Sequence, residues 1–213
     1  MSNYLEPVII VSPPRSGSSL TGTILNRLGI FSGVTKAGDR YNRGGYNENL
    51  GITELLIKEL QAADTYGEGK RFQPLSLKFD YCNFRQDVYE IMSSQGLQHN
   101  QPWYYKDPKI AICRNLFIEH FPNAKWVWVN RDLNDTIWSL MQTPFMNAYN
   151  ETDEWMRFLN VYAQYKHDLK STVTNMFELD ITAIMNKDSS QIQALADYCG
   201  VPNTIKDNLS FVL

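Results

Sequence analysis

The chain has 213 residues, 43% of them hydrophobic, so it can bury a core without help from disulfides or a structural metal. Its formal net charge of -3 argues against a nucleic-acid-binding protein, because such proteins carry a basic excess. The N-terminus lacks the pattern of a signal peptide, and no apolar run reaches the roughly 20 residues of a membrane span. We therefore expect one domain over residues 1–213, without a transmembrane segment and located in the cytoplasm.

The first elements predicted along the chain are a strand, a loop and a helix. Residues 7–11 form a β-branched apolar run, as in a strand buried on both faces. From Ser19 to Leu28 apolar residues recur at helical spacing, and Gly29 follows where a helix would end. The glycine-rich and polar stretch 31–47 predicts an irregular surface loop.

Strands and helices are predicted to alternate through the rest of the chain. The expected strands cover 75–79, 103–106, 125–130 and 175–179, and the expected helices cover 52–63, 86–94, 134–141, 154–169, 191–199 and the stretch from Pro108 to about His120. This alternation predicts an α/β fold, a parallel sheet covered by helices on both faces. Ligands of such sheets bind at the carboxyl ends of the strands.

The loop between the first strand and the first helix has the composition of an anion site. Its candidate binding residues are Pro14, Arg15, Ser16, Gly17, Ser18 and Ser19. Unpaired N–H groups at a helix start favour an oxyanion, glycine lets the backbone approach it, and arginine adds charge. A Walker-type loop would have lysine at the position of Ser18. An ordinary turn with a helix cap is the alternative interpretation.

A second candidate anion site follows the strand over 125–130. Arg131 stands at its end, and Ser139 lies one to two turns into the next helix, so both can hold one phosphate group. The alternative is that Arg131 pairs with Asp132 or Asp135 and that the helix face is merely polar.

Taken together, these segments resemble the sulfotransferase superfamily. Its members bind the 5'-phosphosulfate of 3'-phosphoadenylyl sulfate (PAPS) on a strand-loop-helix, and the 3'-phosphate with an arginine and a serine eight residues apart, the spacing of Arg131 and Ser139. Further similar stretches occur in the family's order at 42–49, 106–108, 121–125 and 177–180. The resemblance implies a three-layer α/β/α, P-loop NTPase-like fold and PAPS as sulfuryl donor, without a metal.

The resemblance also implies catalytic roles. Arg15 and Lys106 are expected to neutralise charge on the donor phosphate. Pro108 stands where cytosolic members have a histidine base, so a different base is needed. The resemblance places Glu48 in the loop-to-helix segment that faces the donor, which makes it the first candidate base, with Asp107 and Asp80 in reserve.

Other roles remain open for these side chains. Glu48 would also favour the dipole of the helix that follows it. Lys106 is alternatively a surface lysine or the partner of Asp107. The acceptor implied is a hydroxyl or amine of a small molecule, sugar or lipid, with no nucleic acid involved.

Two rival functions share parts of this pattern. A P-loop kinase of a small molecule has the same architecture with a different donor, and a non-catalytic anion-binding module would keep the pocket without turnover. The absence of a Walker lysine argues against the kinase.

Overall fold

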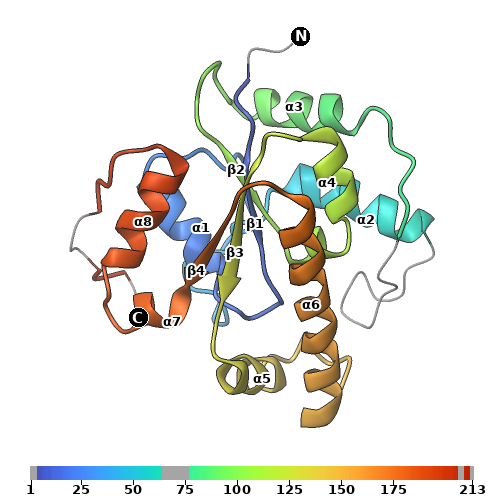
Figure 1. The fold of residues 1–213 in the computed structure, drawn as a ribbon, viewed down its shortest axis with the longest axis vertical. Coiled ribbons are helices and arrows are strands. Elements are labelled where there is room, and N and C mark those ends of the chain that lie inside the picture. The colour runs from blue at the N-terminus through green and yellow to red at the C-terminus, as the bar shows by residue number, and fades with distance from the viewer. Residues whose placement is uncertain (1–3, 64–76, 206–208, 212–213) are drawn as a thin grey trace.

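The computed structural model describes residues 4–63, 77–205 and 209–211. Within them, a parallel sheet is built in the order β2-β1-β3-β4 (Figure 1). Its strands are β1 (Val8–Val11), β2 (Tyr104–Lys106), β3 (Lys125–Asn130) and β4 (Met176–Asp180). The predicted parallel sheet is confirmed.

Helices cover both faces of the sheet, because each central strand points alternate apolar side chains to opposite sides. Ile9 and Val11 of β1 pack in one core cluster, and Val8 and Ile10 in the other. The first face carries α2 (Leu50–Ala62), α3 (Phe84–Ser94), α4 (Arg114–His120) and α6 (Thr152–Thr172), and the second carries α1 (Ser18–Arg27), α7 (Ile181–Met185) and α8 (Ser190–Cys199) (Figure 1). The fold is therefore the predicted three-layer α/β/α arrangement.

The prediction of a strand over 75–79 is wrong for the part of that range that the structure describes. Residues 77–79 have no regular structure, and residues 75 and 76 lie outside the described part of the chain. Leu77 and Phe79 instead pack their side chains against the core cluster to which α2 and α3 contribute. The alternation of apolar residues in this segment thus reflects packing against the core, without pairing to another strand.

The helices differ from the expected ones in two places. The stretch after Pro108 is a 3₁₀ turn, Pro108–Ala111, and α4 begins only at Arg114, because the Asp107 side chain accepts the Lys109 N–H and caps the tight turn. The sequence did not predict α7, which is too short for periodicity to reveal. Asp180 caps it by accepting the N–H groups of Thr182 and Ala183.

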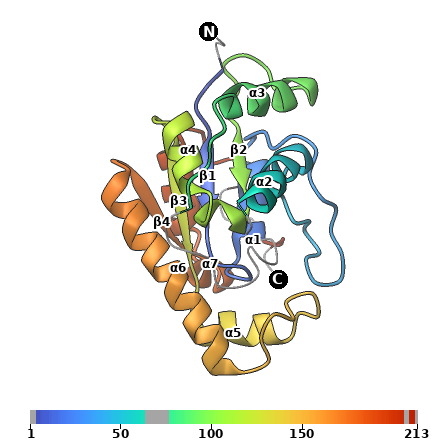
Figure 2. The same cartoon turned by 90° about the vertical axis from the view of Figure 1, so that its right-hand side faces the viewer.

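The site is positioned by two segments at the carboxyl edge of the sheet. Helix α5 (Leu133–Met141) lies beyond the end of β3, and the segment that follows it approaches the loop over 36–46 (Figure 2). The rings of Tyr41 and Phe145, one from each segment, meet edge to face at 5.8 Å. Among the described residues, no helix combines the length and apolar character needed to cross a membrane.

Candidate active site

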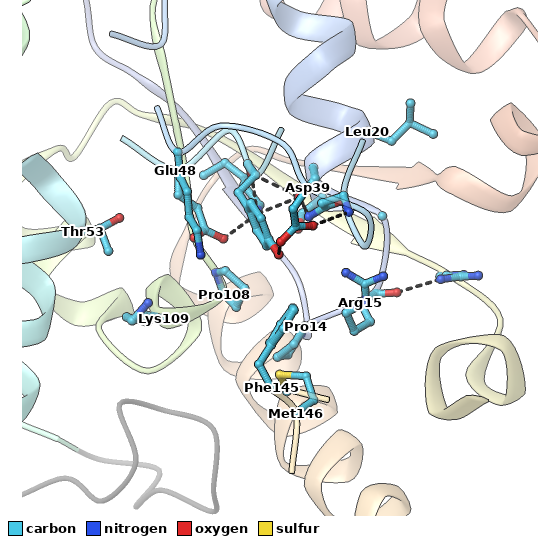
Figure 3. Close-up of a pocket in the computed structure, with 18 of the residues that line it drawn as sticks. Pro14, Arg15, Leu20, Asp39, Glu48, Thr53, Pro108, Lys109, Phe145 and Met146 are labelled. Atoms are coloured by element: carbon cyan, nitrogen blue, oxygen red, sulfur yellow. Dashed lines mark hydrogen bonds and ion pairs between the residues drawn. The ribbon is translucent and has the colours of Figure 1, made fainter. Parts of the chain in front are cut away.

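A cavity of about 670 Å³ lies where the carboxyl ends of the strands meet these two segments. Its walls come from the loop before α1, the loop over 36–48, α2, the 3₁₀ turn, and the segment after α5. In Figure 3, Arg15 lies on one side of this cavity, and Thr53 and Lys109 lie on the other. The cavity thus joins segments that are far apart in the sequence.

The start of α1 has the backbone geometry of an anion-binding loop. Gly17, the residue before α1, has φ of 89°, and a Cβ added there would lie 2.6 Å from Cγ1 of Ile181. Arg15 also has a positive φ, 65°, which is uncommon for a residue other than glycine. No side chain in the described residues caps α1, so its first N–H groups remain available to a ligand in the cavity.

Arg15 and Arg131 lie side by side at this loop. Nε of Arg15 donates to Oγ of Ser139 at 3.1 Å, and Nη1 of Arg131 donates to the carbonyl oxygen of Arg15 at 2.9 Å. Arg15 and Arg131 both line the cavity, whereas Ser139 is buried behind Arg15. The tertiary structure therefore brings both predicted anion segments to one site.

The charges at this point favour an anion. Burial lowers the pKa of Arg15, and the positive charge of Arg131 lowers it as well, while Tyr46 and Asp39 act in the opposite direction. Buried Nε of Arg131 has no hydrogen-bond partner among the described residues. Two guanidinium groups at one cavity, one with an unused donor, suit the oxygens of a phosphate or sulfate.

Lys106 is buried at the end of β2, with 2% of its side chain exposed. Its Nζ donates to Oγ of Ser19 at 3.2 Å, to the carbonyl oxygen of Tyr46 at 3.0 Å and to Oε1 of Glu48 at 2.8 Å. These three bonds use all three donors of the ammonium group. Lys106 is thus neither a surface lysine nor the partner of Asp107.

Glu48 is held at the cavity by its neighbour Asn47. Asn47 has φ of 58°, and its Nδ2 donates to the carbonyl oxygen of Ser19 and to Oγ1 of Thr23. Gly22 makes room for it, since a Cβ there would lie 2.6 Å from Cβ of Asn47. The contact fixes the direction in which the chain enters α2, and Glu48 lines the cavity as a result.

The loop over 36–46 contributes contacts that sequence reasoning did not identify. Asn42 Nδ2 donates to Oγ of Ser19 at 3.0 Å, and the Tyr46 hydroxyl donates to Oδ2 of Asp39 at 2.7 Å. Burial, followed by this bond to Asp39, raises the pKa of Tyr46 to about 12. Both pairs involve an irregular loop, which has no periodicity from which its side-chain partners could be predicted.

The other predicted residues occupy different places. Pro14, Gly17, Ser18 and Ser19 line the cavity with Arg15, whereas Ser16 is buried beneath the loop. The reserve candidates Asp107 and Asp80 do not line it. Asp107 is buried and accepts hydrogen bonds from Thr53 and Tyr105. Within the described ranges, no group of three or more His, Cys, Asp or Glu side chains is arranged to hold a metal ion.

A family model described as the sulfotransferase family matches residues 7–205. No curated protein sequence is detectably similar to the chain. Because the match spans most of the chain, it covers the loop before α1 and the Arg131 segment alike.

Several solved structures have a similar fold. The sulfotransferase domain of the Synechococcus PCC 7002 olefin synthase is 16% identical with a TM-score of 0.61, covering 97% of this chain and 77% of that one. The sulfotransferase domain of the curacin biosynthetic pathway is 16% identical, with a TM-score of 0.59 and coverage of 93% and 75%. A sulfotransferase from Mycobacterium avium is 12% identical, with a TM-score of 0.60 and coverage of 95% and 65%.

Proposed function

We propose that this chain, which belongs to the sulfotransferase family, transfers a sulfuryl group from PAPS to a hydroxyl or amine of a small acceptor. The observation that carries the proposal is the meeting of Arg15 and Arg131 at the uncapped start of α1. Two cations and a row of N–H donors at one cavity match a ligand with two separate anionic groups.

The residues at this end of the cavity fit the donor. The unpartnered Nε of Arg131 and the side chain of Ser139 would hold the 3'-phosphate. The loop before α1 would hold the 5'-phosphosulfate, with Arg15 placed between the two groups. The donor-binding set is the one predicted from sequence, Pro14 to Ser19 with Arg131 and Ser139, in which buried Ser16 supports the shape of the loop.

When bound, PAPS supplies an activated sulfuryl group on a phosphate leaving group. Glu48 accepts the proton of the acceptor hydroxyl while the new oxygen–sulfur bond forms and the bond from sulfur to the bridging phosphate oxygen breaks. Arg15 and Lys106 stabilise the negative charge that grows on that leaving oxygen. The products are the sulfated acceptor, 3'-phosphoadenosine 5'-phosphate (PAP) and protonated Glu48. Most of the rate gain is expected from positioning and charge.

Glu48 is favoured as the base because it alone among the three candidate carboxylates lines the cavity. Its bond to Lys106 holds the carboxylate beside the start of α1, through the contact of Lys106 with Ser19. The role in the dipole of α2 is the weaker alternative, since Asn49 already caps that helix by accepting the Ile52 N–H.

We also propose that residues 1–213 form a single sulfotransferase domain, supported by a family match over 7–205 and by a single parallel sheet in the described residues. A cytoplasmic location stays a prediction from the sequence. The acceptor is taken to be a small molecule, in keeping with a cavity of about 670 Å³.

The test is thermal unfolding with PAP, with ATP and magnesium, and with neither. We expect PAP at about 100 times its dissociation constant to raise the melting temperature by roughly 5–10 °C, because it binds only the folded state. A rise with magnesium and ATP alone would instead support a kinase. A PAP-induced rise without labelled sulfate transfer to any acceptor would indicate a non-catalytic module.

A further inference from the structure

Several large apolar side chains line the cavity, together with the polar residues Thr53 and Lys109. Leu50 and Ile57 reach it from α2, Pro108 from the 3₁₀ turn, and Phe145 and Met146 from the segment after α5. Leu50 is 47% exposed and Phe145 37%, although both lie at the cavity. Figure 3 shows Phe145 and Met146 grouped together with Pro14. Large apolar side chains exposed within a binding cavity indicate a ligand that covers them.

The carboxylate of Asp39 and the hydroxyl of Thr53, which both line the cavity, already bond to other protein groups. Asp39 accepts hydrogen bonds from the Tyr46 hydroxyl and from the N–H groups of Tyr41 and Asn42. Thr53 Oγ1 donates to the buried carboxylate of Asp107 at 3.1 Å. A sugar acceptor carries many hydroxyls, and each one buried without a partner costs free energy. The lysines of the lining also have protein partners, since Nζ of Lys109 lies 3.4 Å from Oδ1 of Asp107 and Nζ of Lys36 lies 4.2 Å from the centre of the Tyr46 ring. The apolar part of the lining therefore suits a ligand with few polar groups.

The apolar part of the lining begins next to the proposed base. Glu48 and Leu50 are separated only by Asn49, and all of the apolar lining residues share the cavity with Glu48 and Lys106. An acceptor with its hydroxyl at Glu48 would extend along α2, whose Thr53 lies on the side of the cavity opposite Arg15 (Figure 3).

Building on the proposed function, we propose that the acceptor is an aliphatic alcohol, with its hydroxyl at Glu48 and its alkyl chain against Leu50, Ile57 and Phe145. In the transfer, the alcohol oxygen bonds to sulfur, the bond from sulfur to the bridging phosphate oxygen breaks, and Glu48 accepts the proton of the alcohol. Each methylene buried against these apolar side chains adds a nearly constant increment to binding of the transition state.

The experiment measures PAP release from saturating PAPS with butanol, hexanol and octanol, and with glycerol and glucose as hydroxylated acceptors lacking an alkyl chain. We expect kcat/KM to rise about threefold per added methylene and hexanol to exceed glucose by roughly a hundredfold. A flat alcohol series, no transfer to any alcohol, or a preference for glycerol or glucose would overturn the inference.

A matched pair of variants tests where the alkyl chain of the acceptor binds. Leu50→Ser should reduce the dependence of kcat/KM on chain length. The variant should still fold, because Leu50 is the first residue of α2 and serine is tolerated at that position of a helix. Leu5→Ser makes the same change at a residue that is 41% exposed and precedes the amino end of β1, so it should keep the full dependence. Equal slopes in both variants would place the alkyl chain elsewhere and contradict the proposal.

PAP binding in the same samples distinguishes a failure of the acceptor inference from a failure of the proposed function. If PAP raises the melting temperature and glucose is the better acceptor, the acceptor inference fails and the proposed function stands. If PAP has no effect and no acceptor is sulfated, the proposed function itself fails.

Discussion

Nζ of Lys106 lies 2.8 Å from Oε1 of Glu48, although 58 positions separate the two residues. The lysine is almost fully buried, and its remaining donors go to Ser19 and Tyr46. This ammonium group therefore ties β2 to the start of α1 and to the loop that carries Glu48. The same contact places a cation and a carboxylate side by side in the lining of the cavity.

The pair should be coupled energetically. We expect Lys106→Met to lower the free energy of unfolding by about 2–4 kcal/mol, because it leaves the partly buried Glu48 without its cation. In the double variant, which also carries Glu48→Gln, the loss of unfolding free energy should be at least about 1 kcal/mol smaller than the sum of the losses in the two single variants. Urea unfolding of the wild type, both single variants and the double variant measures this coupling. Effects that simply add would show that the contact contributes little.

Glu48→Gln tests the base directly. The amide keeps the size of the side chain but cannot take the acceptor proton, so kcat should fall by roughly 10² to 10⁴-fold. The dissociation constant for PAP should change little. Glu54→Gln makes the same change on the exposed side of α2 and serves as the control. Sulfate transfer at the wild-type rate by Glu48→Gln would assign the proton transfer to another group.

Ser139→Ala tests the phosphate site. Its Oγ accepts from Nε of Arg15, and we propose that it also binds the nucleotide. Loss of one such hydrogen bond should weaken PAP binding by roughly 5- to 10-fold. Ser94→Ala is the matched control, since Ser94 bonds only to Ile91 of its own helix among the described contacts. Titration calorimetry with PAP provides the comparison, and equal affinities in the two variants would exclude Ser139 from the site.

Gly22→Ala probes the contact that orients Glu48. In an unhindered helix this substitution stabilises by about 1 kcal/mol. Here the new Cβ would lie 2.6 Å from Cβ of Asn47, so we expect a net loss of about 1–3 kcal/mol. The value of kcat should fall as well, because Asn47 precedes the proposed base. A higher melting temperature for Gly22→Ala would contradict this account of the contact.

Glu178 predicts a pH dependence of stability. Hydrogen bonds from Lys166 and Lys170 lower its pKa from the ordinary 4.5 to about 2. A carboxyl whose pKa is lowered by folding stabilises the protein above its ordinary pKa, and this contribution is lost as the pH falls from about 4.5 to about 2.

Chemical unfolding across this range measures the effect. The wild type should lose stability more steeply than Glu178→Gln as the pH falls. Glu54→Gln, an exposed glutamate changed in the same way, should keep the wild-type slope. Identical slopes for the wild type and Glu178→Gln would show that another group controls the acid response.

The sequence by itself determined most of the elements and indicated two candidate anion-binding segments. Strand β1 could be read from its apolar run, and the eight-residue spacing of Arg131 and Ser139 could be read directly, because each signal lies within a single segment. The order of these segments also indicated the family. The strand expected over 75–79 was wrong because alternating apolar residues can pack against a core without a partner strand.

Only the tertiary structure decided which side chains meet. The bond from Arg15 to Ser139 spans 124 positions, and Lys106 pairs with Glu48 rather than with the adjacent Asp107. Such contacts depend on the order of strands in the sheet and on the path of the loop over 36–48, neither of which is encoded in the local spacing of residues. Local periodicity fixes the direction in which a segment faces, whereas the partner it finds depends on how all the segments pack together.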